Sequence, residues 1–333
     1  MFVDVLFGVL PLFFLMLAGY GASYSKRFAS VEPALNVFVF YAALPALLYQ
    51  VVARADISGG VPSEFLWGSA GAALLSAVLF WAIFRYLIRL GRARSLAGML
   101  TASFGNVSYL GIPVILGVLG PQAGFAAGMG QLVHNVIFMV GFPVLAQIAL
   151  PATQASGQRP NFGRILRTIR AALLYNPVTW AMLAGGAVVT WQIHLPSPVD
   201  ATVDMLAAAA APGALFTIGL SLRRTVQRLS RTRVVPDSGE GQRGASSAML
   251  IMVLGKLLVL PLLTVGVLRL FAPQLDAVWF NAAVLMAAVP TSATAYIMAQ
   301  TDTGDGEPTA LAIVITCALS LLTLPLLAQL FMQ

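Results

Sequence analysis

The chain has 333 residues, of which 59% are hydrophobic and only 9% are charged. Soluble domains carry about 25% charged residues, so this composition, with a mean hydropathy of +0.87, excludes an ordinary soluble globular protein. The net charge of +7 invites a nucleic-acid-binding interpretation. The basic residues, however, lie in short segments between long apolar runs, where they set topology and contact anionic lipid headgroups. We therefore expect a membrane protein whose partners include lipid but not nucleic acid.

Ten apolar runs follow one another along the chain. A membrane-spanning helix needs about 20 mostly apolar residues, and each run meets this length. In chain order they cover residues 3–24, 33–53, 65–88, 95–120, 123–150, 172–194, 198–222, 247–271, 276–300 and 309–332. The sequence therefore predicts an all-α membrane protein with ten transmembrane helices. The single cysteine, Cys317, lies in the last run, so we expect neither a disulfide nor a cysteine-based metal site.

Positive charge gathers in alternate connections between these runs. In a ten-helix arrangement, all but three of the 19 Lys and Arg residues share one face. The exceptions are Arg54 and Arg269 on the other face and Lys256 inside the eighth run. Because Lys and Arg accumulate on the cytoplasmic side, we expect both termini to be periplasmic. The polar, Gly/Ser-rich segment 223–247 is expected to be a flexible cytoplasmic linker.

The fourth and ninth runs are each interrupted near the middle, at residues 105–113 and 287–294. A helix broken in contact with lipid would leave backbone groups unpaired, so broken helices occur inside protein or around a polar cavity. Paired breaks in the two halves of a chain are the best sequence pointer to a transporter's binding site. The alternative is that glycine and proline only kink two helices for packing.

The two halves of the chain also echo each other. The second run contains the pattern Pro-x-x-Leu-aromatic at residues 45–49, and the seventh repeats it at 212–216. With five runs in each half, the halves have opposite orientations, so we predict an inverted repeat. The expected division is a first five-helix repeat over 1–150, a cytoplasmic connection over 151–171 and a second five-helix repeat over 172–333.

These segments resemble the auxin efflux carrier family, in its bacterial branch of malonate-transporter-like proteins. Each matching segment is short, but their order over the whole chain is specific. They are Leu44–Tyr49, Asn106-x-x-Tyr109-x-Gly111-x-Pro113, His134-Asn135, Asn176-Pro177, Pro212-x-x-Leu215-Phe216-x-x-Gly219-x-Ser221-Leu222, Lys256 with Pro261, and Ala288-x-Pro290.

The resemblance implies a fold shared with bile-acid/sodium symporters, in which broken helices 4 and 9 cross. Helices 1, 2, 6 and 7 would form a scaffold, and helices 3–5 and 8–10 a transport domain that moves as an elevator. It also implies a homodimeric secondary carrier of a small organic anion, a carboxylate, in the bacterial inner membrane. We expect no enzymatic activity and no cofactor or metal, with H⁺ or Na⁺ as the candidate coupling ion.

The residues around the two breaks are the candidate substrate site. Each second half-helix would begin at the membrane midplane, and its N-terminus carries unpaired N–H groups and about half a positive charge, which suits a carboxylate. Pro113 and Pro290 suit the first turn of these half-helices, where a missing N–H costs little. The other candidates are Asn106, Ser108, Tyr109, Gly111, Asn135, Thr291, Ser292, Thr294 and Tyr296. For the two tyrosines, apolar packing is an equal alternative.

Two titratable residues lie inside predicted helices. Lys256 could counter the substrate charge or take part in proton coupling, since charge inside a membrane usually marks function. Its long side chain could instead snorkel to the cytoplasmic face. His134 could relay protons, or be a hydrogen-bonded packing residue. Asp204, near the outer end of the seventh run, is expected to face water.

Other classes remain open at this point. The alternatives within the transporter class are a sodium-coupled transporter like the bile-acid symporters and a cation/proton antiporter, of which the antiporter is the nearest rival. A cation/proton antiporter would usually need midplane carboxylates, and the sequence has none at the centre of a run. An intramembrane enzyme is more remote, because no protease or prenyl-transferase motif is present. A passive channel would differ from a carrier in showing no trans-stimulation.

Overall fold

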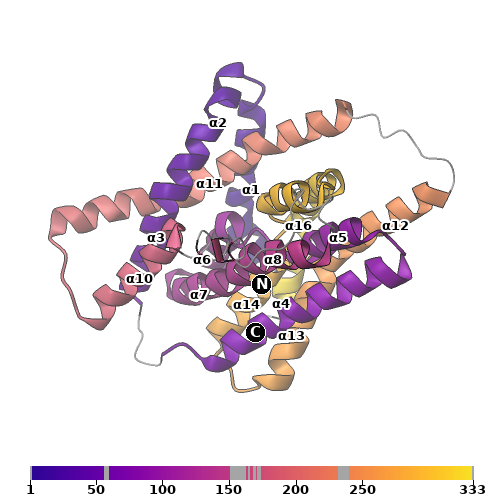
Figure 1. Ribbon diagram of the computed structural model, residues 1–333. Helices are drawn as coiled ribbons and strands as arrows, with labels where there is room; N and C mark the ends of the chain where they lie inside the picture. The colour runs from indigo at the N-terminus through magenta and orange to yellow at the C-terminus, as the bar shows by residue number, and fades with distance from the viewer. Residues whose placement is uncertain are drawn as a thin grey trace.

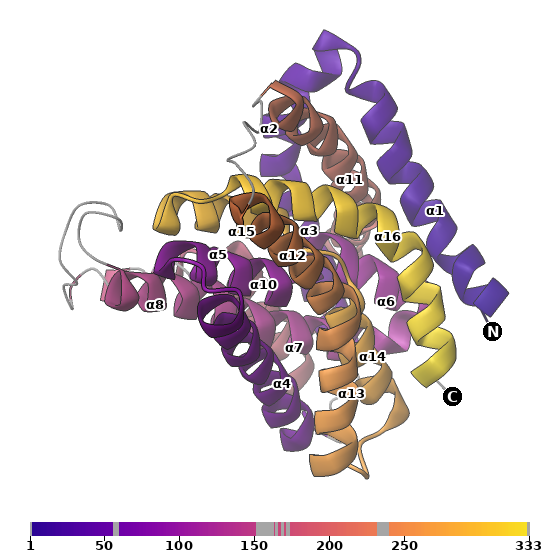
Figure 2. The same ribbon diagram turned by 90° about the vertical axis from the view of Figure 1, so that its right-hand side faces the viewer.

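The computed structural model describes residues 2–55, 60–150, 163, 166–167, 170, 174–231 and 240–331. Over these residues the chain is helical and contains no β-strand. The predicted all-α class is therefore confirmed for the described part of the chain. Figures 1 and 2 show the helices packed side by side, with the two ends of the chain close together in both views.

The first half of the chain forms five helical runs joined by short connections. Several runs contain a π-helical turn, marked η, and η4 is a 3₁₀ turn. The elements are α1 (Phe2–Ala22); α2 (Lys26–Phe38), η1 (Val39–Ala43) and α3 (Leu44–Ala53); α4 (Ser63–Ala82) and η2 (Ile83–Leu87); α5 (Arg92–Ser103), η3 (Val107–Gly111) and α6 (Ile112–Leu119); and η4 (Pro121–Ala123), α7 (Gly124–Asn135), η5 (Val136–Val140) and α8 (Gly141–Ala149).

The second half follows the same plan over its described residues. Its elements are α10 (Pro177–Thr190); α11 (Ser197–Arg231); α12 (Glu240–Leu254), η6 (Gly255–Val259) and α13 (Leu260–Phe271); α14 (Ala277–Ala288), α15 (Ala293–Met298) and η7 (Ala299–Thr303); and α16 (Glu307–Phe331). The breaks between α5 and η3 and between α14 and α15 fall inside the fourth and ninth predicted spans.

Seven helical runs are long and apolar enough to cross a membrane: Val5–Ala22, Lys26–Ala53, Ser63–Leu87, Pro121–Ala149, Ser197–Gln227, Ala245–Phe271 and Glu307–Phe331. The remaining three predicted spans contain the shorter apolar helices Val107–Leu119, Pro177–Thr190 and Ala277–Ala288. Two of these are short because the chain leaves the helix at the breaks. The protein is thus a multi-pass membrane protein, and the count of ten stays a prediction.

The linker expected over 223–247 is too long. α11 continues to Arg231 and α12 begins at Glu240, so helix occupies both ends of that segment. The guanidinium carbon of Arg223 lies 3.9 Å from the ring centroid of Tyr24, a cation–π contact that holds the α11 extension against the end of α1. Residues 232–239, and most of the expected connection 151–171, lie outside the described residues.

Helices α1 and α11 cross at two glycines, and both views show them side by side (Figures 1 and 2). A Cβ atom at Gly19 would lie 2.1 Å from the carbonyl oxygen of Phe216, and one at Gly219 would lie 2.0 Å from that of Met16. Both distances are far below van der Waals contact, so only glycine permits this approach of two backbones.

An ion-pair cluster joins the C-terminal end of α3 to the N-terminal end of α11. Arg54 lies 3.1 Å from Asp200 and 2.7 Å from Asp204, and Gln50 donates to Asp204 at 2.6 Å. Asp204 therefore does more than face water, which corrects the expectation for this residue. The cluster lies at the opposite helix ends from the basic face, which we define by Lys26 and Arg27 at the start of α2 and by Arg223 and Arg224 toward the end of α11.

Candidate functional site

The two breaks lie directly against each other. Gly105 and Thr291 form an isolated antiparallel β-bridge. The amide of Asn106 donates to the carbonyl of Pro290 at 2.8 Å, and the amide of Ser292 donates to the carbonyl of Phe104 at 3.0 Å. Backbone groups that the breaks release from one helix are thus paired with the other. This reciprocal pairing explains how two helices can be interrupted inside an apolar protein.

Side-chain caps start both second half-helices. Asn106 Oδ1 accepts from the amide of Tyr109 at 3.3 Å, at the start of η3. Ser292 Oγ accepts from the amide of Thr294 at 3.2 Å, at the start of α15. Short polar side chains at the N-cap satisfy N–H groups that the first helical turn leaves unpaired. Asn106 and Ser292 therefore define where each broken helix resumes.

The expected position of the two prolines is wrong. The π-helical turn η3 precedes Pro113, so this proline lies in the second turn of its half-helix. Pro290 lies ahead of α15, in the break itself, where its carbonyl accepts from Asn106. The reason is that Asn106 and Ser292 provide the N-caps, so proline is not needed there. Neither proline, nor Gly111, is among the described residues that line the cavity below.

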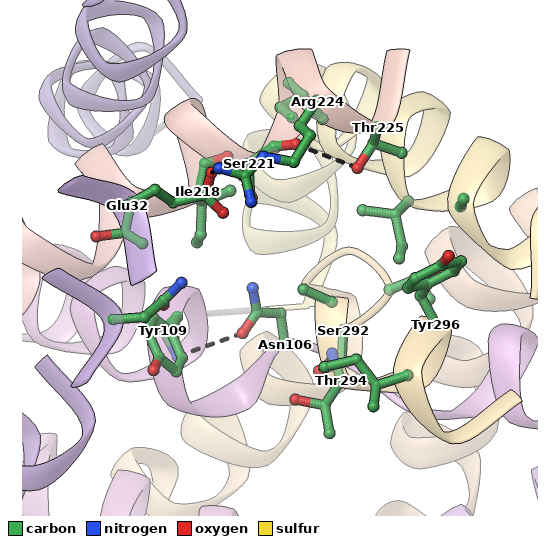
Figure 3. A pocket seen from close by; sticks show the side chains of 18 of the residues that line it. Glu32, Asn106, Tyr109, Ile218, Ser221, Arg224, Thr225, Ser292, Thr294 and Tyr296 are labelled. Atoms are coloured by element: carbon green, nitrogen blue, oxygen red, sulfur yellow. Dashed lines mark hydrogen bonds and ion pairs between the residues drawn. The ribbon is translucent and has the colours of Figure 1, made fainter. Parts of the chain in front are cut away.

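A cavity of about 780 Å³ extends from the crossing toward the basic face (Figure 3). This volume lies within the range of roughly 300–1,000 Å³ typical of small-molecule sites. Helices α2, α11 and α16 form its other walls. The predicted site residues that line it are Asn106, Tyr109, Thr291, Ser292, Thr294 and Tyr296. In Figure 3 the amide nitrogen of Asn106 points into the open space.

Thr291 lines this cavity, but its hydroxyl and its amide are already hydrogen-bonded. Its hydroxyl donates to the carbonyl of Thr101 at 3.0 Å, and its amide donates to Thr316 Oγ1 at 3.2 Å. These bonds tie the second break to α5 and α16. Thr291 therefore stabilises the crossing, whereas Asn106, Ser292 and Thr294 present polar groups to the cavity.

Ser108 and Asn135 lie around a second, smaller cavity of about 40 Å³, which shares Asn106, Ser292 and Thr294 with the large one. Gln131 Nε2 donates to Ser108 Oγ at 2.9 Å, and Asn176 also lines this cavity. The sequence interpretation missed Gln131 as a site residue. Its signal was available, because Gln131 precedes Asn135 by one helical turn and so shares its face.

His134 is bonded to the backbone of the first break. Its Nε2 accepts from the amide of Gly105 at 3.0 Å. Its ring packs against Phe104 and Phe138, with centroid distances of 5.5 and 4.8 Å. His134 is not among the described residues that line the large cavity. The geometry matches the hydrogen-bonded packing interpretation, and the proton relay stays a prediction.

Lys256 does not snorkel. Its side chain is fully buried, with 0% exposure, and Nζ donates to the carbonyl of Ala287 at 2.5 Å. Because α14 ends at Ala288, the ammonium group caps the partial negative charge at the C-terminus of this half-helix. Lys256 is not among the described lining residues of the large cavity. It therefore acts on the crossing and not by direct contact with that space.

The described residues contain no group of three or more His, Cys, Asp or Glu side chains that could hold a metal ion.

Similarity to known proteins extends over most of the chain. The family model described as Membrane transport protein matches residues 4–328. A protein of Rhizobium meliloti (strain 1021) named "Putative malonate transporter" is 27% identical over 316 residues, which cover 95% of this chain and 92% of the relative.

Two further relatives carry less specific names. An "Uncharacterized transporter" of Methanothermobacter thermautotrophicus is 26% identical over 297 residues, 88% of this chain and 86% of the relative. The "Uncharacterized transporter YfdV" of Escherichia coli (strain K12) is 24% identical over 224 residues, 64% of this chain and 67% of the relative.

Proposed function

Because the chain belongs to the Membrane transport protein family, which confirms its resemblance to the auxin efflux carriers, we propose that it is a secondary carrier of a small organic anion. That it is a multi-pass membrane transporter follows from the family and from the apolar helices. Its relatives are named as transporters, which is consistent with a protein that is not an enzyme. The substrate class is the finer part of the proposal.

The observation that carries the anion proposal is the position of the cavity. Its inner end lies at the two N-capped starts of η3 and α15. Helix N-termini present N–H groups and partial positive charge, so they favour a carboxylate without an arginine at the midplane. Asn106, Ser292 and Thr294 add polar groups at the same end. A cation/proton antiporter would place carboxylates there, and the described residues at this end of the cavity include none.

We further propose that the carrier works by alternating access, as an elevator with two inverted five-helix repeats and ten transmembrane helices. The contacts of α1 and α3 with α11, and the close approach of Gly185 in α10 to α3, support a scaffold built from helices 1, 2, 6 and 7. The cavity opens on the basic face, which supports an inward-facing arrangement if that face is cytoplasmic. We also propose that the protein is a homodimer in the bacterial inner membrane and that its transport is coupled to H⁺ or Na⁺.

The function is tested with purified protein in proteoliposomes. Labelled malonate and a panel of other mono- and dicarboxylates are offered, and the pH and sodium gradients are varied separately. We expect uptake of at least one carboxylate that unlabelled substrate on the opposite side stimulates. Uptake without this stimulation would indicate a channel. Equal uptake of the matched neutral amides would contradict the anion proposal.

The orientation has its own test. Single cysteines are placed at Gln242 and at Ser63 in a variant that lacks Cys317. We expect a membrane-impermeant maleimide to label position 242 only from the cytoplasm and position 63 only from the periplasm. The reverse pattern would contradict the proposed orientation and the periplasmic termini.

A further inference from the structure

An ion pair lies where the large cavity opens on the basic face. Arg224 in α11 places Nη2 2.8 Å from Glu32 Oε2 in α2, and the same nitrogen donates to the carbonyl of Ala29 at 3.0 Å. Both side chains line the cavity, as does Glu307 at the start of α16. Figure 3 shows Glu32 and Arg224 across the open space from Asn106, Ser292 and Thr294.

Arg224 is the one basic side chain among the described residues that line this cavity. Its side chain is 44% exposed, whereas that of Glu32 is 9% exposed. The guanidinium can therefore be reached from the cavity, while the carboxylate is largely covered. Both contacts that Arg224 makes with described residues use Nη2, so Nε and Nη1 can donate to another acceptor.

The charges at this opening bear on how an anion would enter. Glu32 and Glu307 repel a carboxylate, so among the described lining residues Arg224 supplies the attraction at this opening. A guanidinium presents a planar fork of donors that matches a carboxylate. Glu32 is itself a carboxylate in contact with that fork. An entering carboxylate and Glu32 would therefore compete for one group.

Resting on the proposed function, we infer that Arg224 is an anion-capture residue and that Glu32 is its internal competitor. A carboxylate substrate displaces Glu32 from part of the guanidinium as it enters the cavity, and Glu32 returns as the substrate leaves. The competition lowers affinity at the opening, so the substrate is not trapped there. Its chemical signature is that neutralising the two partners changes anion affinity in opposite directions.

The alternative is that the ion pair only ties α2 to α11. A structural tie is broken equally by removing either charge, so Glu32→Gln and Arg224→Gln would then change affinity in the same direction. Arg223 offers a matched control. It is the next residue on the same helix, but it contacts Tyr24 and the carbonyl of Ser23 and is not among the described lining residues.

The experiment measures binding of malonate, and of malonamide as its neutral counterpart, to the purified full-length protein by calorimetry. Another carboxylate from the transport panel replaces malonate if the wild type prefers it. We expect Glu32→Gln to tighten anion binding by about two- to fivefold and Arg224→Gln to weaken it by a similar factor, the range that partly exposed ion pairs support. Arg224→Lys should retain part of the affinity, and Arg223→Gln should match the wild type. Malonamide binding should not respond to either charge.

Each result has one meaning. A gain of affinity in Glu32→Gln cannot arise from misfolding, so it supports competition even if Arg224→Gln proves unstable. Changes in the same direction, or no change in Glu32→Gln, overturn the capture role and leave the proposed function intact. If the wild type binds no carboxylate in the panel, the proposed function itself fails, and the capture role fails with it.

Discussion

The amide nitrogen of Asn106 lies 2.8 Å from the carbonyl oxygen of Pro290, and this hydrogen bond joins the two interrupted helices. The side chain of the same asparagine caps η3 and faces the cavity. One residue therefore joins the two breaks through its backbone, caps a half-helix through its side-chain oxygen, and presents its side-chain amide nitrogen to the cavity. Substitutions of the side chain leave the first of these roles in place.

Asn106→Ala should weaken anion binding by about 1–3 kcal/mol, the cost of leaving a buried polar group unpaired. It should also cost about 1 kcal/mol of stability through loss of the N-cap. Asn106→Asp is the matched variant, because a carboxylate oxygen can still cap η3 but adds a negative charge to the cavity. We expect Asn106→Asp to fold and to lose anion binding almost completely. Calorimetry with the carboxylate panel, together with melting temperature, measures both effects.

Retained anion affinity in Asn106→Asp would contradict the placement of the substrate at this end of the cavity. Unchanged affinity in Asn106→Ala would contradict the assignment of the Asn106 side chain to the substrate site.

Substitutions of Lys256 should lower the stability of the protein and should not weaken the binding of anions selectively. Lys256→Met removes the donor to the carbonyl of Ala287 and leaves that buried oxygen unpaired, which should cost about 1–3 kcal/mol of unfolding free energy. Lys256→Gln keeps an N–H donor on a side chain that is one bond shorter, so it should recover part of the loss. Because Lys256 is not a described lining residue, any loss of affinity should be equal for anionic and neutral ligands. Melting temperatures and paired binding assays check this, and a loss confined to anions would instead place its charge in direct use.

Much of the helical plan could be predicted from the sequence, because apolar runs of about 20 residues have few other structures in a membrane. The breaks were also predictable, since glycine, proline and polar residues interrupt the fourth and ninth runs. The exact pairing was not. Which amide meets which carbonyl depends on the angle at which two helices cross, so Gly105–Thr291 and Asn106–Pro290 emerge only in three dimensions.

The side-chain partners of the site were harder still to predict. Lys256 and Ala287 are 31 residues apart, and Glu32 and Arg224 come from opposite halves of the chain. No periodicity connects such pairs. The sequence interpretation placed the start of each half-helix at a proline, Pro113 or Pro290. The structure instead starts them at the N-caps Asn106 and Ser292, whose residue types are common at this position.

Gly219→Ala should destabilise the protein strongly. The added Cβ would lie 2.0 Å from the carbonyl oxygen of Met16, which belongs to backbone and cannot rotate away. Separating α1 from α11 to make room should cost about 1–3 kcal/mol or more, as overpacking does in cores. Gly186→Ala in α10 is the matched control, because a Cβ there meets nothing within 4 Å. Thermal unfolding in one detergent should lower the midpoint for position 219 only, and equal midpoints would contradict the close crossing.

Asp302 should make stability depend on pH. It follows α15, beyond the end of the ninth predicted span, and burial raises the pKa of its carboxyl from 3.8 to about 6. The folded state therefore holds the proton more tightly than the unfolded state. The favourable contribution is complete below the unfolded pKa and is lost as pH rises through about 6. The melting temperature of the wild type should thus be higher near pH 5 than near pH 7.

Asp302→Asn resembles the protonated form, so it should melt higher than the wild type at pH 7 and lose this part of the pH dependence. If the difference between the two proteins stays constant from pH 5 to pH 8, the carboxyl of Asp302 does not titrate in this range in the folded protein.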